Sequence, residues 1–154
     1  MPWLLLLVTM MTGQDHHRAM NERGAMVMGF DQEKTIHHFH LYQDGGAIDI
    51  AVKEASDVKN RDAIRAHLPH IASMFGTGNF AAPMIVHDTA AVPGTGILKE
   101  RKDLIRYDYV QTPAGGRVDI RTTDPAALAA LHDFLRYQIA DHRTKDPLTI
   151  TTRP

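Results

Sequence analysis

Two short stretches, GGAIDI at Gly45–Ile50 and GGRVDI at Gly115–Ile120, differ at only two positions and reveal an internal repeat. Each follows a segment of alternating apolar and polar residues, IHHFHLY before QDGG and LIRYDYV before QTPAG. A Gly-containing turn between two such segments is typical of a β-hairpin. The sequence therefore predicts two hairpins that start their second strands on equivalent glycine pairs.

A helical pattern follows each hairpin. Apolar residues recur every three or four positions, which is the spacing of an amphipathic helix. Asp57 or Ser56 can cap the first helix, and Asp124 with Pro125 can begin the second. We therefore predict an α+β fold of duplicated ββα units, with a four-stranded antiparallel sheet and two helices on one face. The apolar positions are Ile64, Leu68, Ile71 and Phe75 in the first helix, and Leu128, Leu131, Leu135 and Ile139 in the second.

The repeat also indicates how the chain is divided. Residues 34–154 are expected to form a single duplicated ββα domain, with the Pro- and Gly-containing stretch Phe80–Asp103 as its linker. Residues 14–33 form an N-terminal Met/His-containing segment, which fits a helix interrupted at Gly24. Pro69 lies within the first predicted helix, so that helix should bend there or be two short helices.

Residues 1–13 resemble the remnant of a secretory signal. The apolar run Trp3–Val8 is too short to span a membrane, which takes about 20 residues, but suits the apolar part of a signal peptide. The alternative is a hydrophobic strand or helix at the start of a cytoplasmic protein. We expect an exported protein, periplasmic or extracellular, with no membrane attachment in its mature form.

Composition narrows the chemistry. The 154 residues contain 17 basic and 18 acidic side chains, so nucleic acid is not an expected partner. The chain has 10 His, 8 Met and no Cys, which excludes disulfides, thiolate zinc sites and a thiol nucleophile. A soft-metal site would have to use imidazole nitrogen and thioether sulfur. Copper or zinc is therefore the expected cofactor.

Three histidines lie together in the first strand, and strand geometry separates them. Aligning the two units on their glycines places His37 with the residues that face the helices. His38 and His40 then point to the open face of the sheet, because side chains alternate along a strand. A His-x-His pair can present two imidazoles to one metal ion. The alternatives are two solvated histidines, or a dimer interface at which two chains supply four imidazoles.

The first helix carries the second candidate site. His67 and His70 are three residues apart and Met74 follows one turn later, an arrangement that suits copper. It also suits the polar shoulder of an ordinary amphipathic helix. His87, in the linker, can lie over either site.

Two further histidines have structural explanations. His132 is expected to be a core histidine, because it replaces an apolar residue on its helix. His142 ends the last helix, where a positive charge would interact favourably with the helix dipole.

These patterns predict a small exported metal-binding protein. The candidate ligands are His37, His38, His40, His67, His70, Met74 and His87. The alternatives are a small metal-dependent hydrolase that uses the same histidines, or a metal-free dimerising or ligand-binding module. No catalytic residue is assigned and no nucleotide-binding loop is present. A histidine base acting on a small substrate would require a pocket.

The segments MGFDQEKTIHHF, HLPHIASMF and HDFLRYQIADH resemble a group of uncharacterised short exported bacterial proteins. The resemblance covers about Ala25–Asp146. It implies export and a domain that stands alone, and it carries no activity or functional residue.

Overall fold

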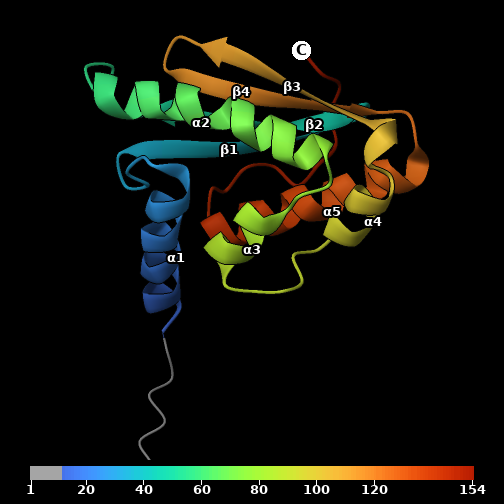
Figure 1. The fold of residues 1–154 in the computed structure, drawn as a ribbon, viewed down its shortest axis with the longest axis horizontal. Coiled ribbons are helices and arrows are strands. Elements are labelled where there is room, and N and C mark those ends of the chain that lie inside the picture. Colours follow the sequence, from blue (N-terminus) through green and yellow to red (C-terminus); the bar gives the residue numbers. More distant parts are fainter. Residues whose placement is uncertain (1–11) are drawn as a thin grey trace, which may run out of the picture.

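The computed structural model describes residues 12–154 of the chain, so the signal-like run Trp3–Val8 lies outside the described residues. Among residues 12–154, no helix is both long and apolar enough to cross a membrane. Figure 1 shows the arrangement of the elements. In chain order they are α1 (Gly13–Met28), β1 (Thr35–Tyr42), β2 (Gly45–Val52), α2 (Val58–Gly76), α3 (Ala81–His87), α4 (Thr95–Glu100), a short 3₁₀ helix (Lys102–Leu104), β3 (Ile105–Thr112), β4 (Gly115–Thr122) and α5 (Pro125–His142).

The predicted α+β fold with duplicated ββα units is confirmed. The four strands form one antiparallel sheet in the order β1-β2-β4-β3, and both hairpins have eight-residue strands. At the centre of the sheet Ile48 pairs with Val118, which is the same position in the other unit. The two hairpins are therefore related by an approximate two-fold axis through this pair.

The repeated glycines allow the two units to approach each other closely. A Cβ on Gly45 would lie 1.9 Å from the Ile120 carbonyl oxygen, and one on Gly115 would lie 2.1 Å from the Ile50 carbonyl oxygen. Gly45 also has a φ of 149°, a conformation that residues with a side chain rarely adopt. The first glycine of each pair is thus required by the β2–β4 contact.

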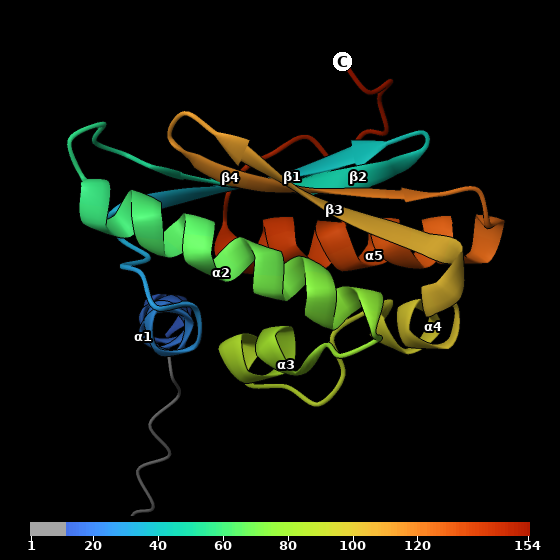
Figure 2. The same cartoon turned by 45° about the horizontal axis from the view of Figure 1, so that its top comes forward.

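The second glycine of each pair lies under a helix. A Cβ on Gly46 would meet Leu135 of α5 at 2.3 Å, and one on Gly116 would meet Leu68 of α2 at 3.0 Å. Both long helices cover the same face of the sheet, as Figure 2 shows. Each packs mainly on the hairpin of the other unit: α2 lies on β3 and β4, and α5 lies on β1 and β2.

Two predictions about the connecting segments are wrong. Helix α1 is not interrupted at Gly24; it runs unbroken from a capping box at Thr12 to Gly29, where the backbone turns left-handed. Gly24 is buried in this helix, and a Cβ there would touch Gln32 at 3.0 Å. The stretch Phe80–Asp103 is more than a linker, because it contains α3 and α4.

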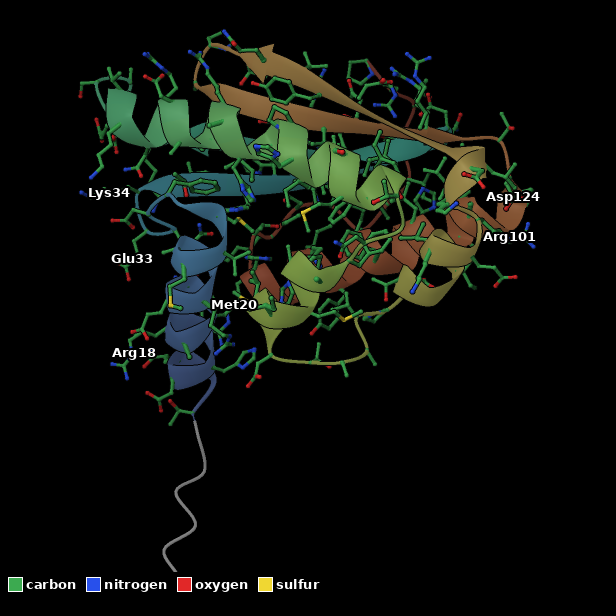
Figure 3. The ribbon with its side chains drawn as sticks, viewed as in Figure 1. Arg18, Met20, Glu33, Lys34, Arg101 and Asp124 are labelled. Atoms are coloured by element: carbon green, nitrogen blue, oxygen red, sulfur yellow. The ribbon has the colours of Figure 1, made fainter. Side chains whose placement is uncertain are left out.

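Local contacts hold these added helices on the duplicated part. Met20 of α1 is 1% exposed, and α1 packs against α3 and α2. Arg101, at the end of α4, donates to the Asp124 carboxylate at 2.9 Å beside the start of α5 (Figure 3).

Helix α2 is a single element with Pro69 inside it, so it is not two short helices.

The C-terminal tail runs along the outer edge of β1. Thr151 exchanges backbone hydrogen bonds with Gln43 (2.9 Å) and Leu41 (3.0 Å), and the Asp146 carboxylate accepts from the Phe39 N–H at 2.9 Å. Arg153 then crosses the open face and donates to the Asp119 carboxylate at 2.8 Å. The tail therefore covers part of the edge and part of the open face.

The glycine contacts make a direct prediction for stability. Gly45→Ala and Gly115→Ala should each lower the free energy of unfolding by about 2 kcal/mol or more, because backbone atoms must move. Gly76→Ala is the control, since its Cβ would meet nothing within 4 Å. Urea unfolding measures all three. Equal stability of Gly45→Ala and Gly76→Ala would contradict the close approach.

Candidate active site

A cavity of about 50 Å³ lies on the helix side of the sheet. Most of its wall is apolar, and five polar side chains also line it: His37, His67, His87, Gln138 and His142. These five side chains come from four elements, namely β1, α2, α3 and α5, which the fold brings together around the cavity. The apolar lining is Met28, Phe39, Ile48, Ile50, Leu68, Ile71, Phe75, Ala82, Pro83, Val86 and Phe134.

His142 is the centre of a cluster of imidazole rings. The His37 ring lies 5.2 Å from it, centroid to centroid, and the His87 ring lies 4.9 Å from it nearly at right angles. His37 comes from β1, His87 is the last residue of α3, and His142 is the last residue of α5. The cluster forms because α5 crosses the hairpin of the first unit and ends beside β1.

His87 is held by two side chains of α5. Its Nδ1 is hydrogen-bonded to Oδ2 of Asp141, and its Nε2 lies 2.9 Å from Oε1 of Gln138. The other carboxylate oxygen of Asp141 lies 3.0 Å from Nε2 of His16 on α1. His87 is 3% exposed. A carboxylate on Nδ1 fixes the orientation of an imidazole and stabilises the charge when the ring takes up a proton.

Burial keeps the other rings of the cluster neutral. It lowers the pKa of His37 to about 4, helped by the charge of His38. It also lowers the pKa of His142 well below the usual value, with further contributions from His37, His87 and His17. The pKa of His67 is lowered in the same way by burial and by His70. Neutral imidazoles have one donor nitrogen and one acceptor nitrogen.

Asp141 behaves differently. Burial would raise its pKa, but hydrogen bonds from His87 and His16, and the charge that these rings can carry, lower it instead. Asp141 is therefore a carboxylate, ready to accept hydrogen bonds from both rings.

Three nitrogen atoms in the cavity wall have no hydrogen-bond partner within residues 12–154. They are Nε2 of His37, Nε2 of His67 and Nε2 of Gln138, and all three are shielded from solvent. A buried polar atom without a partner costs roughly 1–3 kcal/mol. Unpartnered polar atoms in the wall of an apolar cavity can bond a water or a ligand that has polar atoms.

The structure separates the HHFH histidines as strand alternation predicts. His37 faces the helices and lines the cavity, whereas His38 and His40 lie on the other face, with ring centroids 6.3 Å apart. Nδ1 of His38 is hydrogen-bonded to Oδ1 of Asp146 at 2.7 Å. The His40 ring stacks on the Tyr42 ring, with their centroids 5.8 Å apart.

The second predicted set also separates. His67 lines the cavity, His70 is exposed, and Met74 is partly buried against the core. His67 and His37 both pack on Phe30, each with a centroid distance of 6.2 Å. The structure therefore brings together His37, His67 and His87 from the predicted ligands and leaves His38, His40 and His70 elsewhere.

The prediction for His132 is confirmed, and the prediction for His142 is not. His132 is a core histidine, with its Nε2 2.9 Å from the carbonyl oxygens of Tyr42 and Gly45. The prediction that His142 is a cation at the helix end is wrong. Burial among other histidines disfavours its charge more than the helix dipole can favour it.

Sequence reasoning missed Gln138 and Asp141, and it placed His16 and His17 in the N-terminal Met/His-containing segment without assigning them to this site. A signal for two of them was present in QIADH, because Gln138, Asp141 and His142 share one side of a helix. The partner helices could not be inferred from it. Within residues 12–154, no three His, Asp or Glu side chains are arranged as the ligands of a metal ion.

The buried imidazoles should make stability depend on pH. Because the pKa of His37 falls from its ordinary 6.5 to about 4 on folding, its contribution is complete above pH 6.5 and is lost as pH falls towards 4. The loss from His37 is up to about 3 kcal/mol. Urea unfolding from pH 7 to pH 4.5 should show a smaller decrease for His37→Phe than for the wild type. A His40→Gln control should keep the full decrease. An unchanged decrease in His37→Phe would contradict this assignment.

Comparisons with protein-family models, with curated proteins and with solved structures give no match.

Proposed function

We propose that the protein is a small enzyme that transfers a proton to or from a small, mostly apolar molecule held in the cavity. One observation carries the proposal: a buried histidine, His87, is oriented by the Asp141 carboxylate in the wall of an apolar cavity. Histidine is the side chain used most often for general acid–base catalysis, and a carboxylate on its other nitrogen orients the ring. Seclusion from water strengthens every electrostatic interaction in such a site.

Gln138 gives His87 two possible states. Nδ1 of the ring donates to Asp141, and Nε2 faces the Gln138 amide, whose oxygen and nitrogen can exchange places to accept from the ring or donate to it. A substrate that takes the place of Gln138 gives its α-proton to Nε2 of the neutral ring, and the imidazolium that forms is paired with the Asp141 carboxylate. The freed amide can turn and present its nitrogen to the same substrate, because its two ends have nearly the same shape.

The unpartnered nitrogens favour a carbonyl compound. Gln138 Nε2 is a donor, and the Nε2 atoms of His37 and His67 are donors in one tautomer. Donors near a base stabilise the negative charge that forms on a carbonyl oxygen when a proton leaves the adjacent carbon. The reaction class that we infer is proton abstraction next to a carbonyl group.

The test follows the exchange of α-protons of butanone for deuterium in D₂O by NMR. The wild-type protein should accelerate exchange above buffer, and His87→Gln should lose about 100-fold or more of the acceleration. Asp141→Asn should also lose most of it, because the ring is no longer oriented. His40→Gln, on the opposite face, is the matched control. Full activity in His87→Gln, or no acceleration by folded wild-type protein, would refute the proposal.

A copper or zinc site is the second candidate, and the cluster around His142 supports it. Two imidazoles on one tetrahedral ion have ring centroids roughly 5 Å apart, close to the 5.2 and 4.9 Å of the His37 and His87 rings from His142. Asp141 behind His87 matches the carboxylate that commonly backs a metal-binding histidine. The rings would have to turn to share an ion. On this reading the ligands are His37, His87 and His142.

Metal titration of untagged protein distinguishes a site at His37, His87 and His142 from a site at His38 and His40 on the open face. If the cluster binds zinc or copper, His142→Gln should weaken binding by about tenfold or more, and His38→Ala/His40→Ala should bind as the wild type does. The reverse result would place the metal on the open face. Identical titrations for wild type and both variants would remove the metal candidate.

A further inference from the structure

A second hollow lies directly outside the cavity. It has a volume of about 430 Å³, and His37 and His142 line both spaces. The rings of His37 and His142 therefore form a wall that the two spaces share. The outer hollow is lined by His17, Asn21, Gln32, Glu33, Thr35, Ile36, His37, His38, Lys53, His142, Arg143 and Thr144.

The two spaces differ in chemistry. The inner cavity is mostly apolar, whereas the outer hollow is lined mainly by polar and charged side chains. At about 50 Å³ the inner cavity holds roughly three or four non-hydrogen atoms. A substrate that fills both must have a short apolar part and a polar part.

The charge of the outer hollow favours an anion. Lys53 and Arg143 contribute two positive charges and Glu33, in the loop between α1 and β1 (Figure 3), contributes one negative charge. Lys53 donates one hydrogen bond to the Glu33 carbonyl oxygen, and Arg143 donates to the Gly13 carbonyl oxygen. Each keeps further donors, because an ammonium has three N–H groups and a guanidinium has five.

The carboxylate of Asp146, which contacts His38 of the hollow, is already engaged. Asp146 accepts from the Phe39 N–H and the Thr144 hydroxyl and pairs with His38. It therefore does not cancel the charge of Lys53 and Arg143 by pairing with them.

We propose that the substrate is a short keto acid, with its alkyl and carbonyl groups in the inner cavity and its carboxylate in the outer hollow between Lys53 and Arg143. This inference rests on the proposed function, which places the carbonyl group beside His87. It adds the carboxylate and the residues that recognise it.

The experiment compares 2-oxobutanoate, whose ethyl and carbonyl groups together have four non-hydrogen atoms, with butanone by NMR titration of the full chain. The keto acid should bind at least about fivefold tighter than the ketone, and added KCl should weaken only the keto acid. Lys53→Gln and Arg143→Gln should each weaken keto-acid binding about fivefold and leave the ketone unchanged. Lys59→Gln, which removes the same charge from outside the hollow, should change neither. Arg143 also contacts α1, so Lys53→Gln is the decisive variant if Arg143→Gln fails to fold.

Equal affinity for the two probes, no binding of either, or no effect of Lys53→Gln would overturn the inference. The deuterium exchange of butanone is measured separately and needs no carboxylate. If that exchange depends on His87 while the two probes bind equally, only the keto-acid inference fails. If the keto acid binds through Lys53 but no α-proton exchanges, the proposed acid–base function fails instead.

Discussion

The contact between β2 and β4 at the glycine pairs is the constraint on which the rest of the structure depends. With the Gly45 and Gly115 backbones in contact with the opposite strand, the two hairpins form one continuous sheet. With Gly46 and Gly116 under the helices, each helix settles deeply on the hairpin of the other unit. This crossing carries the end of α5 to β1, where His142, Asp141 and Gln138 meet residues that are distant in the sequence. The site is thus a consequence of how the two units are joined.

The two units have different residues at equivalent positions, and this difference explains why the site lies beside the first hairpin. His37 pairs with Ile50, and Tyr107 pairs with Ile120, so these two residues hold equivalent places in the two units. Tyr107 packs on Phe75 at 5.9 Å, and burial raises the pKa of its hydroxyl. An aromatic hydroxyl packed in this way fills space, whereas the imidazole of His37 lines a cavity. Helices α1 and α3 increase the difference, because they add His16, His17 and His87 beside the first hairpin.

Local patterns were sufficient to predict the sheet, both long helices and the face on which His37 lies. Each depends on a period of two or of 3.6 residues and on the repeated glycines, which are visible in the letters. The site was predicted only in part, because it needs contacts between elements that no local pattern specifies. His87 could be placed only after α3 was seen to pack against α5, and the partnership of Asp141 with both His16 and His87 spans 125 and 54 residues of sequence. Burial then reversed the expected charge of His142, since the helix dipole is a weaker effect than desolvation.

The tail along β1 makes the two edges of the sheet unequal. The outward-facing backbone groups of Phe39 and Leu41 on β1, and of Gln43 in the turn after it, are bonded to Asp146 and Thr151. In the described part of the chain, no strand pairs with the outer edge of β3. Free strand edges are where sheets extend into neighbouring molecules. The tail leaves only the Thr35 end of the β1 edge uncovered, so β3 offers the longer edge for such an extension, and two molecules joined β3 to β3 would form a two-fold pair. Growth beyond this pair would have to use the short uncovered part of β1, so the tail opposes edge-to-edge growth into a fibre.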